Sequence, residues 1–142
     1  MLFRSIHKLK KGAPPKMDMA YAKRIHDGIL HFIRQGRVKS AHDCSEGGIA
    51  VALAECCMSN SEVQIGATID LPVSAAALFG ESQSRIVLSA SPANAEKILA
   101  SGLPVTKLGT TGGDKLRIGK LAWPVATLRD AWWSAIGRLM ES

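Results

Sequence analysis

The residues best suited to chemistry in this sequence of 142 residues gather in one stretch, Ser40-Ala-His-Asp-Cys-Ser-Glu-Gly-Gly48. The stretch joins a segment expected to be extended, Val38–Ala41, to one expected to be helical. The first N–H groups of a helix lack backbone partners and carry partial positive charge, so a phosphate can bind there. Ser45, Gly47 and Gly48 are therefore candidate phosphate-binding residues.

The same stretch also fits a purely structural role. Ser45 is a suitable N-cap, and Glu46 is favourable in the first turn of a helix. The two glycines then serve close packing between the strand and the helix. Both interpretations stay open at the level of the sequence.

A second polar stretch, Phe79-Gly-Glu-Ser-Gln-Ser-Arg85, comes directly before an apolar run, Ile86–Ala90. The apolar run is typical of a buried strand, so the polar residues are expected at its mouth. The candidates for binding a polyol or a phosphate are Glu81, Ser82, Gln83 and Arg85. Alternatively, these side chains cap turns and join neighbouring elements, with Arg85 paired to Glu81.

A third stretch, Gly109-Thr-Thr-Gly-Gly-Asp114, lies between two apolar runs. It resembles a phosphate-cradling loop, but no Lys-Ser or Lys-Thr and no helix follow it, so it is not a P-loop. Gly-Gly-Asp between apolar runs predicts a β-hairpin.

The elements that position these stretches follow from hydrophobic spacing. A helix is predicted over Met19–Gln35, with Asp18 as its N-cap and Gly36 as its stop. Further helices are expected at Ile49 to about Met58, Ala75–Phe79, Ala93–Ala100 and after Thr127, and strands at Val38–Ala41, Val63–Leu71, Ile86–Ala90, Leu103–Leu108 and Leu116–Leu121. This order predicts an α+β domain of layered α/β/α type with one mixed sheet.

The last predicted helix carries two of the three tryptophans, Trp132 and Trp133. Thr127 is expected as its N-cap, with Asp130 completing an arrangement like a capping box. Apolar residues recur along it at helical spacing, and Trp132 on this stripe is expected in the core.

The composition indicates one globular domain, with 46% hydrophobic residues and a net charge of +6. Seven basic residues fall within the first 24: Arg4, Lys8, Lys10, Lys11, Lys16, Lys23 and Arg24. Such an end can bind nucleic acid or a membrane, but without interleaved aromatic residues we favour a linker. No apolar run is long enough to cross a bilayer. Three cysteines without zinc-ligand spacing suggest reduced thiols and a cytoplasmic protein.

The sequence resembles a known family in three motifs that occur in order. The motifs are SAHDCSEGGIAVALAE (40–55), LFGESQSRIV (78–87) and LGTTGGDKL (108–116). Together they are similar to the phosphoribosylformylglycinamidine synthase large-subunit family, and more narrowly to its last domain, an AIR synthase-related C-terminal domain. The final helix with Trp132-Trp133 fits as well. The resemblance covers residues 17–142, and residues 1–16, which include Pro14-Pro15, look like a linker or the tail of a preceding domain.

The resemblance implies an ATP- and Mg²⁺-dependent amidation of formylglycinamide ribonucleotide with glutamine as nitrogen donor. ATP and Mg²⁺ are then bound mainly outside this chain, which is a fragment without catalytic residues or a metal site of its own. The implied partners are the preceding domains, the glutaminase and the small subunit, with no nucleic acid and no membrane.

In this family the Glu-Ser-Gln motif contacts the substrate in the first half of a duplicated protein. Here Glu81-Ser82-Gln83 occupies the second-half copy. These residues then either hold the domain against its partners or bind a structural nucleotide or phosphate. Two alternative hypotheses are that the chain is a domain of another enzyme of the superfamily, such as aminoimidazole ribonucleotide synthetase, or that it is a basic nucleic-acid-binding module.

Overall fold

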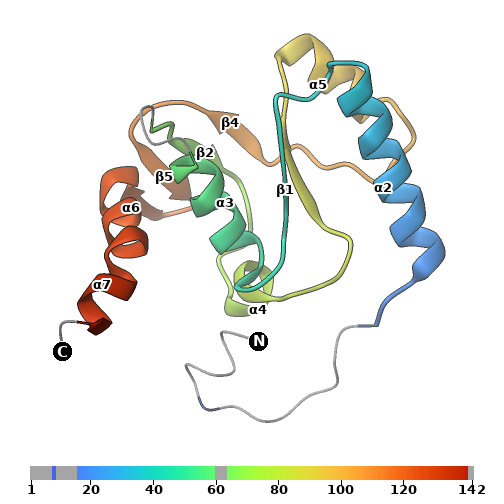
Figure 1. Ribbon diagram of the computed structural model, residues 1–142. Helices are drawn as coiled ribbons and strands as arrows, with labels where there is room; N and C mark the ends of the chain where they lie inside the picture. Colours follow the sequence, from blue (N-terminus) through green and yellow to red (C-terminus); the bar gives the residue numbers. More distant parts are fainter. Residues whose placement is uncertain (1–7, 9–15, 60–63, 141–142) are drawn as a thin grey trace. The chain divides into compact units, whose positions relative to one another are not determined.

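A computed structural model describes residue 8 and residues 16–59 and 64–140 (Figure 1). The helices and strands are α2 (Met19–Arg34), β1 (Ser40–Asp43), α3 (Gly48–Met58), β2 (Ala67–Ile69), α4 (Ala75–Phe79), β3 (Ile86–Ser89), α5 (Pro92–Leu99), β4 (Gly109–Thr111), β5 (Lys115–Ile118), β6 (Leu121–Pro124), α6 (Val125–Trp133) and α7 (Ala135–Met140). The chain forms two compact units, residues 1–52 with 78–107 and residues 53–77 with 108–142. The predicted tail, 1–16, lies almost entirely outside the described residues.

Helix α2 confirms the prediction made from its local signals. The Asp18 carboxylate accepts a hydrogen bond from the Tyr21 N–H at 3.0 Å, as an N-cap does. Gly36 follows the helix with φ of +64°, a left-handed conformation that glycine adopts without strain. The buried residues of α2 are Ala22, Ile25 and Phe32, which recur at helical spacing and form an apolar stripe.

In the first unit, α2 packs against the loop that follows α5. The guanidinium of Arg24 donates to the Gly102 carbonyl at 2.7 Å. Gly28 approaches Leu103 so closely that an added Cβ would lie 2.3 Å from its Cδ1. Leu103 lies in the segment predicted as a strand, 103–108, which is a loop in the structure, so that prediction is wrong.

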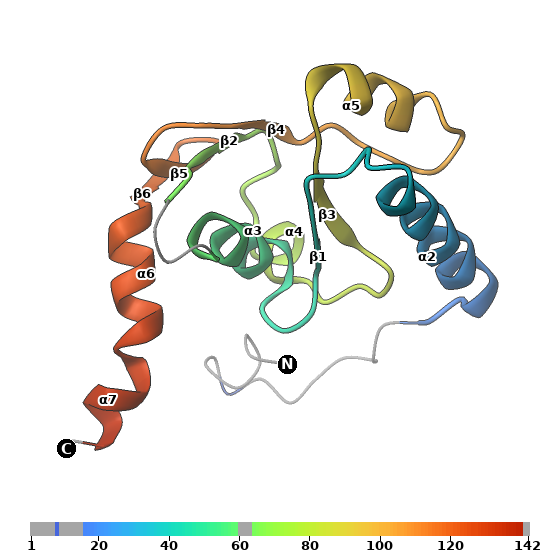
Figure 2. The ribbon, with the colours of Figure 1, turned by 45° about the horizontal axis from the view of Figure 1, so that its top comes forward.

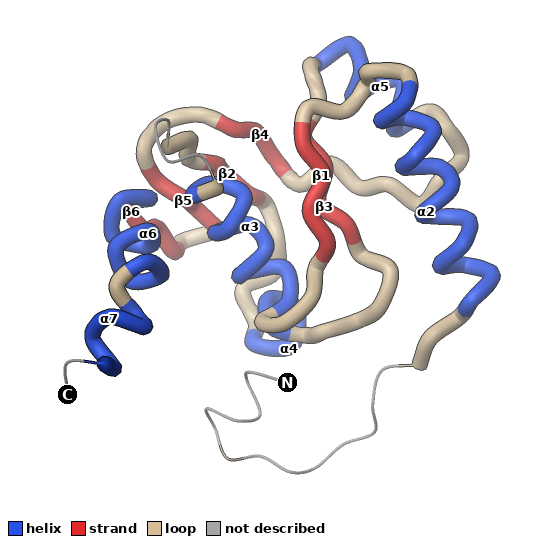
Figure 3. Tube along the Cα trace, viewed as in Figure 1, coloured by secondary structure: helices blue, strands red, loops and turns tan. Residues whose placement is uncertain are grey.

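Strands β1 and β3 form a two-stranded antiparallel sheet in the first unit (Figure 3). Their register pairs Ser40 with Ser89 and Asp43 with Ile86. The pairing continues one step beyond β1, where the Cys44 N–H donates to the Arg85 carbonyl at 2.9 Å. The ends of the two polar stretches identified in the sequence are therefore neighbours.

The second unit contains a four-stranded mixed sheet in the order β4-β2-β5-β6. Strand β2 pairs antiparallel with β4 and parallel with β5. This confirms a mixed sheet in an α+β fold, but the structure has two sheets where one was predicted, because β1 and β3 pair only with each other.

The hairpin predicted at Gly109–Asp114 is wrong. Strands β4 and β5 do not pair with each other, because β2 lies between them. Gly66, the residue just before β2, bonds to the turn between β4 and β5. Its N–H donates to the Gly113 carbonyl at 2.8 Å, and its carbonyl accepts from the Gly112 N–H at 2.7 Å. The hairpin of this sheet joins β5 to β6 instead, through Gly119 with φ of +57°.

The core of the second unit centres on Leu116, Ile118 and Val125, which are under 2% exposed. Leu116 and Ile118 alternate with exposed residues along β5, which is typical of a strand buried on one face. Helix α6 begins at Val125, whose N–H donates to the Asp114 carbonyl at 2.9 Å. Thr127 therefore lies inside the helix, and its predicted role as N-cap is wrong.

Helix α6 ends at Trp133 and is capped by Ser134, whose N–H and hydroxyl both donate to the Asp130 carbonyl, at 3.1 and 2.5 Å. Helix α7 then continues away from the sheet (Figure 2). Trp132 is 57% exposed, so the predicted core position is wrong: α6 meets the core at its first residue, Val125, and the tryptophan lies two turns further on. No helix within the described ranges is long and apolar enough to cross a membrane.

Candidate functional site

The loop between β1 and α3 is organised by Asp43 and Ser45. The Ser45 hydroxyl donates to the Asp43 carboxylate. The Ser45 carbonyl accepts from the Gly48 N–H at 3.2 Å, which closes a turn before the helix. Because α3 begins at Gly48, Ser45 lies two residues before the flanking position, and the predicted N-cap role is wrong. Glu46 likewise precedes the helix instead of lying in its first turn.

The two glycines of this loop are buried against the second polar stretch. The Gly47 N–H donates to Oε1 of Glu81 at 3.2 Å. Gly48 has φ of +65°, and an added Cβ would lie 2.8 Å from the carbonyl oxygens of Leu78 and Gly80. Gly48 therefore packs closely against the end of α4 and the turn after it, whereas the sequence interpretation placed this packing between the strand and the helix.

The second polar stretch is a tight turn held by its own arginine. The Arg85 guanidinium donates through Nη2 to the Gly80 carbonyl, five residues back. Ser84 has φ of +60°, which is uncommon for a residue other than glycine. The Nε of Arg85 is buried and has no hydrogen-bond partner within the described part of the chain. A buried donor without a partner marks a place where an acceptor from a ligand or another chain fits.

The two stretches together enclose a cavity of about 330 Å³ in the first unit. Its lining residues are His26, Asp43, Cys44, Ser45, Glu46, Glu81, Gln83, Ser84, Arg85 and Ile86. Four of the seven predicted site residues line it: Ser45, Glu81, Gln83 and Arg85. Gly47 and Gly48 are buried and Ser82 is exposed, and none of the three lines the cavity.

Sequence reasoning missed part of this lining. His26 is an exposed residue of α2, and it lines the cavity. Nothing in its local spacing signals this, because the packing of α2 brings it there. Ser84 also lines the cavity. Its position inside the second motif was the only feature of the sequence that could have indicated this.

The charges around the cavity are mainly negative. Asp43, Glu46 and Glu81 contribute carboxylates, and Arg85 contributes the one guanidinium of the lining. The Ser45 hydroxyl, and secondarily the backbone of Asp43 itself, lower the pKa of the Asp43 carboxyl below its ordinary value. Burial raises the pKa of the Cys44 thiol, so the thiol stays protonated and is a poor nucleophile at neutral pH. Such a lining suits hydroxyl and amide groups, with Arg85 available for one anionic group.

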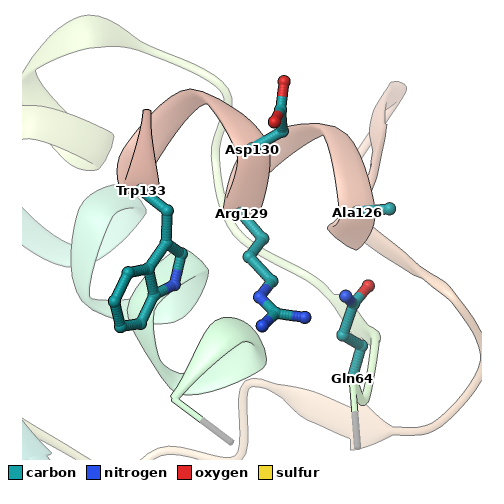
Figure 4. Close-up of a pocket in the computed structure, with 5 residues that line it drawn as sticks. All are labelled: Gln64, Ala126, Arg129, Asp130 and Trp133. Carbon is teal, nitrogen blue, oxygen red and sulfur yellow. The ribbon is translucent and has the colours of Figure 1, made fainter. Parts of the chain in front are cut away.

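A second hollow, of about 430 Å³, lies beside α6 in the second unit (Figure 4). Its lining residues are Gln64, Ala126, Arg129, Asp130 and Trp133. The side chains of Trp133 and Arg129 extend from α6 to the same side, Gln64 points toward the helix from the facing segment, and the Asp130 carboxylate points the other way. None of the predicted site residues lies here. Within the described residues, no group of three or more His, Cys, Asp or Glu side chains is placed to hold a metal ion.

Comparison with known proteins gives a family match and curated relatives. The family described as AIR synthase related protein, C-terminal domain, matches residues 2–119. The chain is 42% identical over 95% of its length to the phosphoribosylformylglycinamidine synthase subunit PurL of Anaeromyxobacter sp. (strain Fw109-5). It is also 42% identical, over 97% of its length, to the subunit of the same name from Chelativorans sp. (strain BNC1). It spans about a fifth of the length of each relative, 20% in both cases.

Solved structures with the same fold come from Thermotoga maritima. PurL complexed with FGAR matches with a TM-score of 0.68 and 20% identity, over 84% of this chain and 23% of that one. PurL complexed with ATP matches with a TM-score of 0.61 and 21% identity, over 74% and 21%. The PurLQS structure matches with a TM-score of 0.64 and 21% identity, over 89% and 24%.

Proposed function

The chain belongs to the family of AIR synthase related proteins, as their C-terminal domain, and from this premise we propose that it is the C-terminal part of a phosphoribosylformylglycinamidine synthase subunit. The whole enzyme converts formylglycinamide ribonucleotide, glutamine and ATP to the amidine in purine biosynthesis. Residues 17–142 form the domain, and residues 1–16 are the tail of the part that precedes it.

One observation carries this proposal. Nearly the whole chain matches relatives of that name at 42% identity, yet it spans only a fifth of their length. A chain with one fifth of the length lacks most of the machinery of an ATP-dependent ligase. The domain alone is therefore inactive, and its contribution is to complete the larger subunit.

ATP and Mg²⁺ belong to the proposed reaction and are assigned mainly to the part outside this chain. A T. maritima relative is complexed with ATP, which supports nucleotide use by the whole enzyme. The residues described here do not fit a metal site, because no suitable ligands gather among them. The Gly47 N–H at the start of α3 donates to Glu81, and Gly48 faces backbone.

The cavity between the two polar stretches is the proposed ligand site of the domain. Ser45, Glu81, Gln83 and Arg85 supply its side chains, while Gly47 and Gly48 hold Glu81 and the adjoining backbone in place. Ser82, the remaining residue of the motif, is exposed and is the last member of the proposed set. The buried, unpartnered Nε of Arg85 supports a ligand that brings an acceptor, such as a phosphate or hydroxyl oxygen.

The proposed partners are the preceding domains of the same subunit, the glutaminase and the small subunit. The match to a structure named PurLQS supports an assembly of this kind. Three free cysteines, two of them buried, support a reducing compartment, and we propose the cytoplasm.

Replacement of the matching region in a relative tests the proposal. In a purine-requiring strain without its own subunit, Anaeromyxobacter PurL with its matching C-terminal region replaced by residues 1–142 should restore growth without purines. The same subunit lacking that region should not. If the chimera accumulates as folded protein and growth is not restored, the proposal is wrong.

A further inference from the structure

The C-terminal helices carry an exposed apolar surface that the proposed function does not use. We define the α6–α7 face by Trp132, Trp133, Ile136, Leu139 and Met140, which are 57%, 69%, 71%, 77% and 83% exposed. Gly137 lies among them, and an added Cβ there would meet nothing within 4 Å. Large apolar side chains exposed side by side mark a surface that another protein surface covers.

The face has the composition of an energetically important contact. A buried tryptophan covers about 150–250 Å², so the exposed parts of Trp132 and Trp133 together offer roughly 200–300 Å². One side of a standard interface buries roughly 800 Å², so the two rings alone supply about a third of one side. Tryptophan is also enriched among residues that dominate binding.

The hollow beside α6 extends this surface. Trp133 belongs to both, and the side chains of Gln64 and Arg129 supply polar groups beside it (Figure 4). An apolar patch next to a recess with polar groups suits a partner that inserts one side chain and covers the rest. The partner surface is therefore apolar, with one anchoring side chain.

The comparisons with known proteins bear on what covers the α6–α7 face. The family match ends at residue 119, before α6 begins at Val125. The full-length relatives match 95–97% of the chain, which leaves too few unmatched residues to omit Val125–Met140. The stretch that matches the long subunits therefore extends past residue 119 into the C-terminal helices, and four fifths of each long subunit lies outside this chain.

We propose that the α6–α7 face docks on the part of the same subunit that precedes this domain. This inference rests on the proposed function, because it needs a parent subunit. A second copy of the chain is the competing occupant, and the experiment separates the two.

The experiment uses the chimera described above and the chain 1–142, both exposed to hydroxyl radicals, with oxidation read at each residue by mass spectrometry. Trp132, Trp133 and Met140 should be oxidised in the chain and protected several-fold in the chimera. Equal oxidation in both overturns the inference.

Ile136→Asp is the test variant, and Met19→Asp on α2 is its matched control, because both side chains are 71% exposed. Neither substitution should change the unfolding midpoint of the chain. Ile136→Asp should abolish growth rescue by the chimera, and Met19→Asp should not.

Three further outcomes separate the docking inference from the proposed function and from binding of a second copy. Rescue by the unaltered chimera together with full rescue by Ile136→Asp overturns the docking inference and leaves the proposed function standing. Failure of the unaltered chimera overturns the proposed function itself. A chain that dimerises in sedimentation, becomes monomeric with Ile136→Asp and shows no protection in the chimera assigns the face to a second copy and overturns our choice.

Discussion

The backbone N–H of Gly47 donates to Oε1 of Glu81 at 3.2 Å, across 34 positions of sequence. This bond joins the loop before α3 to the turn before β3. The two polar stretches that line the cavity are therefore linked directly to each other. Gly47 is buried, and its N–H depends on this carboxylate for a partner. Glu81 is consequently a structural link of the domain as well as a proposed ligand-binding side chain.

Substitution of Glu81 by alanine should destabilise the chain. A buried N–H left without its charged acceptor costs about 1–3 kcal/mol, and a loss of about that size is expected in the free energy of unfolding. Denaturant unfolding monitored by circular dichroism measures it. Ser82→Ala, at the exposed neighbouring position, is the control and should stay within about 0.5 kcal/mol of the unaltered chain. Equal stability of the two variants would show that the bond contributes nothing.

Gly48 and Gly36 allow a comparison of steric and conformational effects, since their φ angles are +65° and +64°. An added Cβ meets nothing within 4 Å at Gly36, but meets two carbonyl oxygens at 2.8 Å at Gly48. Gly36→Ala should therefore cost only the left-handed conformation, about 1–2 kcal/mol. Gly48→Ala should cost about 1–3 kcal/mol more, because backbone must move. Thermal unfolding of both variants decides this, and equal losses would contradict the packing described here.

Local signals sufficed for α2. Its N-cap, its apolar stripe and its terminal glycine all lie within 19 residues of sequence, so the helix could be predicted without tertiary information. The hairpin at Gly109–Asp114 failed for the opposite reason. Whether β4 and β5 pair with each other or with β2 depends on a segment some 40 residues away, and the turn residues look the same in both cases.

The site could be predicted in part. Motif spacing identified Ser45, Glu81, Gln83 and Arg85, which do share a cavity. His26 could not be predicted, because only the packing of α2 brings it there. Trp132 shows a different limit: an apolar stripe indicates that a helix face needs an apolar partner, but not whether the chain itself provides one.

Loss of the Ser45 hydroxyl should change the acid titration of Asp43. That hydroxyl is the main cause of the lowered pKa, so Ser45→Ala should raise the Asp43 pKa toward its ordinary value of about 3.9. Because the folded-state pKa is depressed, the Asp43 contribution to stability is present above the unfolded pKa and is lost as the pH falls through the folded pKa. The two proteins should therefore differ in stability near neutral pH and converge in acid. Carboxyl NMR titration checks the pKa, and an unchanged value in Ser45→Ala would contradict the assignment.

The net charge of +6 should not give nucleic-acid binding. Two of the seven basic residues near the N-terminus already have partners within the chain: Lys23 pairs with Asp27 at 2.5 Å, and Arg24 donates to Gly102. We expect no measurable binding to duplex DNA or RNA by fluorescence anisotropy at about 50 mM salt, where phosphate contacts are strong. Tight binding that weakens steeply as salt rises would favour the nucleic-acid module over the synthase domain.

The amidation rate of the purified chimera tests the central claim most directly. Anaeromyxobacter PurL carrying residues 1–142 in place of its matching region is supplied with formylglycinamide ribonucleotide, ATP, Mg²⁺ and ammonia, and amidine formation is measured. We predict turnover by the chimera, none by residues 1–142 alone, and none by the subunit lacking the region. A folded chimera without turnover, or turnover by the isolated chain, would contradict the account.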